Sequence, residues 1–391
     1  MSKMQVVYVP HTPPETFLKS IFLAGPSPRD PSHYDWRPEA LVHLENLDYD
    51  GVVFVPLPID REDWRHGFDA QVDWEKKYLD MCDVIVFWVP RDMTSLPALT
   101  TNIEYGMYLE SGKVVLGYPM DAPNMRYMAM HADKQFIPRF HDLRETLACA
   151  IDRIGAGAER TGGERDVPLL VWKTKQFQSW ITAQKLAGNR LDGAHVLWTF
   201  CVGPKNSFLF SYAVRVNVFI ANEGRNKTNE FILARPDVSS IVAYHPTSKN
   251  ILDTEIAIVR EFRSPAAVGD YFVREIPGGS SWKSTDDVFE TAAHELSEET
   301  GFTVAGNRLK FLGVRQVAAT FSTHLSHVFA CEITDDEIRF LRAQEGIAHG
   351  VIEDTERTYV EIYTVRELLS RPLTDWANLG MILTALLSKE S

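Results

Sequence analysis

The stretch SIFLAGP at residues 20–26 is a short, unbroken apolar run that ends in a Gly-Pro turn. Three further runs have the same character and are rich in β-branched residues: GVVFVP at 51–56, DVIVFWVP at 83–90 and KVVLGY at 113–118. Apolar runs of this length, without alternation, are typical of strands buried on both faces of a parallel sheet. Helical stretches are expected between them, around residues 36–47, 70–81 and 102–111. Strand–helix alternation predicts an open α/β sheet.

This pattern predicts two domains joined by a connecting segment. Residues 1–154 are expected to form the open parallel-sheet domain, of flavodoxin-like or Rossmann-like architecture, in which ligands bind beyond the carboxyl ends of the strands. Residues 155–193 are interpreted as a Gly-rich, charged linker followed by a bridging helix over 171–187. Residues 194–391 combine strands and turns with helices near 286–300 and 375–388, which predicts an α+β domain.

Composition excludes several classes of protein. The chain has 391 residues and a formal net charge of -13, which argues against general binding to a nucleic-acid polymer. Its four cysteines are far apart and predict neither a zinc cluster nor a disulfide framework, so a reducing cytoplasm is the expected location. No apolar segment approaches the length of a membrane span, and the N-terminus lacks a signal-peptide pattern. A small-molecule ligand is therefore expected.

A glutamate-rich helix stands out in the second half, in the stretch HELSEETGF at 294–302. Glu295, Glu298 and Glu299 are spaced to share one helix face, and Gly301 is placed to end the helix. Carboxylates so close repel each other, and a hard divalent cation, Mg²⁺ or Mn²⁺, would offset that repulsion. The alternative is a solvated acidic face, which the charge pattern alone favours.

The wider stretch resembles the Nudix box, with Glu295, Leu296, Glu298, Glu299 and Gly301 in register with its final portion. Three features depart from the family pattern: Asp286 stands where the family has Glu, His294 replaces an Arg, and the glycine loop is one residue longer. The resemblance implies a Nudix-fold domain with metal ligands at Glu295, Glu298, Glu299 and Asp286. Glu298 and Glu299 would be catalytic.

The surroundings of the box support the same resemblance. Arg263 and the stretch EIPGG at 275–279 look like the segment that leads into the box in ADP-ribose and nucleotide-sugar pyrophosphatases. Arg263 and Gly279 are then expected to contact the substrate, although a surface role for Arg263 is equally compatible with the sequence. The acidic stretch at 353–356 resembles the place where such enzymes supply a further carboxylate.

The first domain carries a carboxylate in the stretch TTNIEYG at 100–106. Asn102 or Thr101 is expected to cap a helix there, which places Glu104 in its first turn at the edge of the predicted crevice. Such a carboxylate can act as a nucleophile on an anomeric carbon. The alternative, favoured when Glu104 is considered alone, is that it complements the helix dipole.

Several short motifs together resemble nucleoside 2-deoxyribosyltransferases and related nucleotide N-glycosidases: FLAGP at 22–26, WE at 74–75, the run at 83–90, NIEYG at 102–106 and SGKVV at 111–115. The resemblance implies that Glu104 is the nucleophile and that Glu75, in place of an Asp, helps protonate the base. Gly25, Arg29 and Asn102 are the implied substrate-binding positions. It also implies a site completed across a subunit interface, hence a homo-oligomer.

The leading hypothesis is a bifunctional enzyme of nucleotide metabolism. The first domain would cleave or transfer at an N-glycosidic bond, and the second would hydrolyse an ADP-ribose-like diphosphate with a divalent metal. One alternative is a Nudix hydrolase whose first domain senses nucleotides. Another is a nucleotide-binding regulator without turnover. The sequence leaves open the base, the diphosphate, the acceptor and the oligomeric order.

Overall fold

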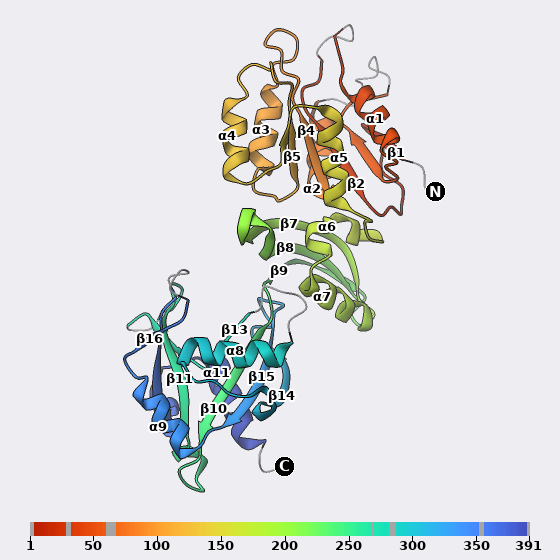
Figure 1. The fold of residues 1–391 in the computed structure, drawn as a ribbon. Coiled ribbons are helices and arrows are strands. Elements are labelled where there is room, and N and C mark those ends of the chain that lie inside the picture. Colours follow the sequence, from red (N-terminus) through yellow and green to blue (C-terminus); the bar gives the residue numbers. More distant parts are fainter. Residues whose placement is uncertain are drawn as a thin grey trace. The chain divides into compact units, whose positions relative to one another are not determined.

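The computed structural model describes residues 4–28, 33–59, 68–267, 270–280, 287–351 and 356–388 (Figure 1). The chain divides into two compact units, Met1–Ala234 and Arg235–Ser391. Three of the predicted site positions lie outside the described residues: Arg29, Asp286 and most of the acidic stretch at 353–356.

The first unit contains a parallel sheet with six strands among the described residues, in the order β1-β3-β2-β4-β5-β6. These strands are β1 (Gln5–Tyr8), β2 (Ser20–Ala24), β3 (Val52–Val55), β4 (Val84–Trp88), β5 (Val114–Gly117) and β6 (Arg139–Phe140). All neighbouring pairs are parallel, which confirms the predicted α/β sheet. Because β3 and β4 lie on opposite sides of β2, the order reverses there, and this switch point is where open α/β sheets form a crevice.

Helices cover both faces of this sheet. They are α1 (Arg37–Asn46), α2 (Phe68–Met81), α3 (Leu99–Tyr108), α4 (Arg126–Lys134) and α5 (Leu143–Ile154). Successive side chains of a strand point to opposite faces, so Ile21 packs in the core that includes α1 and α5, whereas Phe22 packs in the core that includes α2, α3 and α4. Burial on both faces explains why the strands are apolar throughout.

The segment after α5 is packed against the sheet, which corrects its interpretation as a linker. Arg160 is 1% exposed, and its guanidinium binds the Asp83 carboxylate through two contacts of 2.8 and 2.9 Å. The same carboxylate accepts hydrogen bonds from the backbone N–H groups of Ser20 and Leu169. The glycine and charged residues of this segment predicted an unpacked linker, but the charge of Arg160 is buried against the sheet. The predicted helical region is present as α6 (Leu169–Trp172) and α7 (Lys175–Leu186).

A three-stranded antiparallel sheet completes the first unit. It consists of β7 (Arg190–Val202), β8 (Phe208–Ile220) and β9 (Arg225–Ala234). Tyr212 and Val214 of β8 pack in the same core as Phe177 of α7, and the Tyr212 hydroxyl lies 2.7 Å from the Thr174 hydroxyl. Because of these contacts, the antiparallel sheet belongs to the first unit. The second unit therefore begins at Arg235, after this sheet, and not at residue 194 as expected.

The second unit is built on a mixed sheet with eight strands among the described residues: β10 (Val238–His245), β11 (Glu255–Phe262), β12 (Phe272–Glu275), β13 (Gly278–Gly279), β14 (Lys310–Gln316), β15 (Leu325–Glu332), β16 (Ala348–His349) and β17 (Thr358–Thr364). Its helices are α8 (Val288–Thr300), α9 (Asp335–Ala343), α10 (Val365–Ser370) and α11 (Trp376–Leu387). Helix α8 packs through Leu296 in one core, and α11 packs through Ile382 in another. This arrangement is α+β, as expected; the Nudix fold remains a prediction.

Among the helices of the described residues, none combines the length and apolar character that a bilayer span requires.

The buried Asp83–Arg160 pair predicts a large loss of stability when one partner is removed. Arg160→Ala leaves the Asp83 carboxylate buried without its cation, which typically costs about 3–5 kcal/mol. The control is Arg190→Ala, because the Arg190–Asp192 pair is exposed on the Arg190 side and exposed pairs contribute little to stability. Urea unfolding measures both variants. Equal destabilisation of the two would contradict the importance given to the buried pair.

Candidate functional site

Two glutamates from neighbouring helices meet at the carboxyl side of the parallel sheet. Glu75 lies on α2, which follows β3, and Glu104 lies on α3, which follows β4. Both side chains are partly buried. Burial, together with the charge of Glu75, raises the pKa of Glu104 to about 7. Burial also raises the pKa of Glu75, against the opposing effects of a 2.8 Å hydrogen bond from Gln71 and of the Arg37 charge. The two predicted catalytic residues are therefore brought into electrostatic contact.

Arg37 is a functional candidate that sequence reasoning missed. Its side chain is 1% exposed, and its guanidinium donates to the carbonyl oxygens of Gly25 at 2.8 Å and Leu23 at 3.3 Å. Its charge lowers the pKa values of both Glu75 and Glu104. A signal was present in the sequence, because a cation in the first turn opposes the helix dipole and needs an anionic partner.

Gly25 has a structural reason to be glycine. Its φ of 153° is one that side chains rarely adopt, and a Cβ atom would lie 2.2 Å from the carbonyl oxygen of Trp88. The turn after β2 can therefore approach the end of β4 only with glycine at this position. Because the Gly25 carbonyl also receives the Arg37 guanidinium, this turn helps to position the cation. Direct contact of Gly25 with a sugar stays a prediction.

The expected capping of α3 is wrong. The helix begins at Leu99 after Ala98, which has φ 59° and makes no side-chain capping bond. Asn102 instead accepts a hydrogen bond of 2.5 Å from Arg91, a buried residue three positions after the last residue of β4. The earlier start places Glu104 at the sixth position of the helix rather than in its first turn. At that depth the helix dipole acts weakly, so dipole complementation explains Glu104 less well than the sequence suggested.

Three aromatic side chains on α2, β4 and α3 lie in the core of the first unit and not on an open surface. Trp74, Trp88 and Tyr105 are 7%, 6% and 4% exposed. The Trp74 indole N–H donates to the carbonyl of His11 at 2.8 Å, and the Tyr105 hydroxyl donates to that of Met128 at 3.2 Å. Their polar atoms are therefore already used within the protein.

In the second unit, α8 presents its glutamates to a glycine strand. Gly301 ends the helix with φ 70°, as predicted. The Glu299 carboxylate accepts a hydrogen bond from the Gly278 N–H at 2.9 Å and is 3% exposed. A Cβ atom on Gly279 would lie 2.5 Å from both Glu295 carboxylate oxygens, so a side chain there would displace Glu295. The glutamate carboxylates of α8 are therefore packed directly against the backbone of β13.

Burial and mutual repulsion strongly perturb these carboxylates. Burial, followed by the charges of Glu298 and Glu356, raises the pKa of Glu295 to about 7. Burial raises the pKa of Glu299 well above its ordinary value, with Glu295 adding to the effect. Glu261 of β11, which sequence reasoning missed, has its pKa raised to about 7, mainly by burial. Acidic side chains with strongly raised pKa values cluster at functional sites, so these carboxylates favour a functional site over a solvated acidic face.

The basic side chains of this region lie close to glutamates of the same unit. Arg263 lies 2.8 Å from Glu275 and 2.7 Å from Glu261, so its predicted contact with a phosphate stays a prediction. His294 lies 3.4 Å from Glu298, one helical turn later. Asp286, the predicted ligand upstream of His294, lies outside the described residues.

Carboxylate oxygens suit a hard divalent cation, but the observed positions are not those of a formed metal site. Within the described ranges, no group of three or more His, Cys, Asp or Glu side chains is arranged to hold a metal ion. The donor chemistry of Glu295, Glu298 and Glu299 fits Mg²⁺ or Mn²⁺, and a cation would offset the repulsion among them. Their side chains would have to converge further to bind it.

Comparison with known families identifies part of the first unit. Residues 18–122 match the family model described as nucleoside 2-deoxyribosyltransferase like. The match runs from β2 through β5 and includes Gly25, Arg37, Glu75 and Glu104, so this part of the chain is similar to that family. It does not extend into residues 235–391. No curated protein matches the chain.

The perturbed pKa of Glu104 predicts a pH-dependent effect on stability. Its pKa rises from 4.5 to about 7 in the folded protein, so folding favours the protonated form. The associated stability is present below about pH 4.5 and is lost as the pH rises through 7. Glu104→Gln is therefore expected to raise the melting temperature at pH 8 more than at pH 4.5.

Calorimetry at both pH values checks this expectation. Glu15→Gln is the matched control, because Glu15 is an exposed loop glutamate and its substitution should leave both melting temperatures nearly unchanged. A Glu104→Gln protein that is less stable than the parent at pH 8 would show that the carboxylate is not buried at a cost in free energy.

Proposed function

We propose that residues 18–122 cleave or transfer at the N-glycosidic bond of a nucleoside or nucleotide, with Glu104 as the nucleophile. The observation that carries this proposal is the pair of partly buried carboxylates, Glu75 and Glu104, beside the buried Arg37 at the switch point of the sheet. The family match over the same residues supports it.

The proposed reaction has two steps. A Glu104 carboxylate oxygen attacks C1′ of the sugar, the C1′–N bond breaks, and its electron pair leaves with the base, which takes a proton from Glu75. Water or another base then attacks C1′, the Glu104–sugar bond breaks, and the proton of the attacking group returns to Glu75. The second step therefore restores both carboxyl groups, as expected for covalent catalysis with a paired acid and base.

In the free protein burial and the charge of Glu75 raise the pKa of Glu104, so the proposed roles require the shared proton to lie on Glu75 when substrate is bound. The nucleophile must be ionised while the acid keeps its proton, so the pair needs one proton between two carboxyl groups. The charge of Glu75 raises the pKa of Glu104, and the pair therefore retains a proton at a pH where separate glutamates have lost theirs. The Arg37 guanidinium stabilises the remaining negative charge.

Activity should depend on both glutamates and on pH. Glu104→Ala is expected to abolish release of free base from deoxynucleosides or their monophosphates, and Glu75→Gln to reduce kcat about 10²–10⁴-fold, as for loss of a general acid. kcat/KM should fall as the pH rises above about 7, because the pair then loses its proton. Chromatography of free base, in the presence of EDTA, measures these effects.

Glu15→Gln is the control and should retain full activity. Turnover that survives in Glu104→Ala would contradict the assigned nucleophile. Binding of nucleotides without any product, in the parent protein, would favour a regulator or a sensing domain instead.

A second activity is proposed for the second unit: hydrolysis of a diphosphate-linked nucleoside such as ADP-ribose. The observation that favours it is the burial of Glu295 and Glu299 against β13, with raised pKa values for both. Glu295, Glu298 and Glu299 would hold Mg²⁺ or Mn²⁺, which when bound polarises the diphosphate and activates a water molecule. The chain would then be bifunctional, with both activities in nucleotide metabolism.

The two activities can be separated by substitution. Glu298→Gln and Glu299→Gln should reduce the Mg²⁺-dependent hydrolysis of ADP-ribose to AMP and ribose 5-phosphate by more than tenfold, because each removes a proposed ligand charge. Release of free base by the first unit should be unchanged in both variants. EDTA should stop the hydrolysis only. Hydrolysis that continues in EDTA, or that is unaffected in both variants, would rule out this metal-dependent role.

A further inference from the structure

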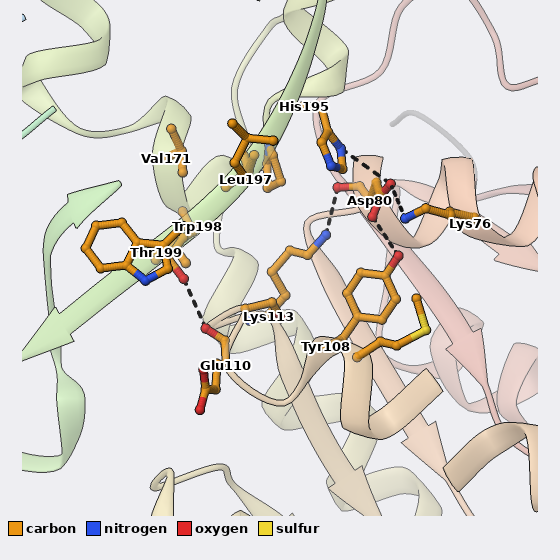
Figure 2. A pocket seen from close by; sticks show the side chains of 15 residues that line it. Lys76, Asp80, Tyr108, Glu110, Lys113, Val171, His195, Leu197, Trp198 and Thr199 are labelled. Carbon is orange, nitrogen blue, oxygen red and sulfur yellow. Dashed lines mark hydrogen bonds and ion pairs between the residues drawn. The ribbon is translucent and has the colours of Figure 1, made fainter. Parts of the chain in front are cut away.

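The first unit contains a cavity at the amino ends of the parallel strands, whereas Glu75 and Glu104 lie toward their carboxyl ends. Its volume is about 310 Å³, and it lies between the C-terminal ends of α2 and α3, helix α6 and strand β7 (Figure 2). Helix α2 begins at the carboxyl edge of the sheet and leads into β4, so Asp80 in its last turn lies at the amino edge. Lys113, which directly precedes β5, lies at the same edge. The cavity is therefore separate from the proposed glycosidic site.

One side of the cavity is a polar network centred on Asp80 (Figure 2). The Tyr108 hydroxyl donates to one Asp80 carboxylate oxygen at 2.6 Å. Lys76 and His195 approach the other oxygen at 3.2 and 3.4 Å. Because these two contacts are longer, Lys76 and His195 can also donate to an acceptor atom of a ligand. Asp80 can accept a hydrogen bond from a ligand N–H.

Charge in the cavity is close to balanced. Lys76 and Lys113 are cations, whereas Asp80 and Glu110 are anions. Burial lowers the pKa of His195, which favours its neutral form near pH 7. Lys113 donates to the main-chain carbonyls of Leu79 and Asp80 at 2.6 and 2.8 Å, so its charge is already compensated by the end of α2. An uncharged ligand fits this balance better than a phosphate dianion does.

The other side of the cavity is apolar and carries an indole. Trp198 is 49% exposed, and its ring is stacked on Phe200 with centroids 5.8 Å apart and planes 6° apart. Leu197 and Val171 continue this wall (Figure 2). A ring held by stacking, yet half exposed in a cavity, offers a platform for a flat molecule.

We propose that this cavity binds a small, uncharged heteroaromatic molecule of the class of a free nucleobase or nucleoside. Its ring contacts Trp198, and its edge donates to Asp80 and accepts from Lys76 or His195. A volume of about 310 Å³ is at the lower end of the range of small-molecule sites. The site is independent of the chemistry proposed at Glu104.

Calorimetric titration tests the proposal with adenine and adenosine as probes and AMP as the charged comparison. The full chain carries Glu104→Ala and is kept in EDTA, so that no probe is turned over. Trp198→Ala in this background should weaken the binding of adenine or adenosine at least about fivefold, as expected for loss of base stacking. Trp376→Ala removes an exposed indole of the other unit and should change nothing.

Leu197→Trp is a second variant, because Leu197 is exposed and a larger side chain there should fill the cavity without disturbing the core. It should abolish the same binding. If adenine and adenosine do not bind, or if their binding is the same in Trp198→Ala and Leu197→Trp as in the background chain, the proposal is wrong. AMP binding that depends on Trp198 and equals that of adenosine would overturn the preference for an uncharged ligand.

Discussion

The buried ion pair between Asp83 and Arg160 is the constraint on which the first unit depends. Asp83 stands immediately before β4, and its carboxylate joins the guanidinium of Arg160 to backbone groups of β2 and of the start of α6. A carboxylate in that position cannot be left unpaired without a large cost in free energy. The pair therefore holds the chain after α5 against the parallel sheet. It thereby positions the segment that leads to β7, β8 and β9.

Buried carboxylates recur in both units, and each carries an electrostatic cost. Glu104 on α3 and Glu295 on α8 both have pKa values raised to about 7, mainly by burial. A protein selected for stability alone would replace such groups with neutral side chains. Their presence at a sheet switch point and beside a glycine strand is consistent with selection for chemistry, in which a charge appears or is neutralised during the reaction.

Helices α2 and α3 connect the two sites proposed in the first unit. Glu75 and Asp80 lie on α2, and Glu104 and Tyr108 lie on α3, so each helix carries one residue of each region. The Tyr108–Asp80 hydrogen bond joins the helices at the amino edge, and electrostatic coupling of the two glutamates joins them at the carboxyl edge. A rigid helix pair of this kind keeps the spacing of the two carboxylates independent of the loops around them.

The elements with a strong local pattern could be predicted from the amino-acid order alone. Continuous apolar runs identified the four central strands, and the spacing of glutamates with Gly301 identified α8. The order of the motifs alone pointed to Glu104 and Glu75 as partners in one site. The start of α3, the contacts of Arg37, the packing of the segment around Arg160 and the unit boundary at residue 234 emerged only from the folded chain. The physical reason is that local patterns report propensity, whereas the partner of a charged or glycine-rich segment lies far away in the chain: Arg160 and Asp83 are 77 residues apart.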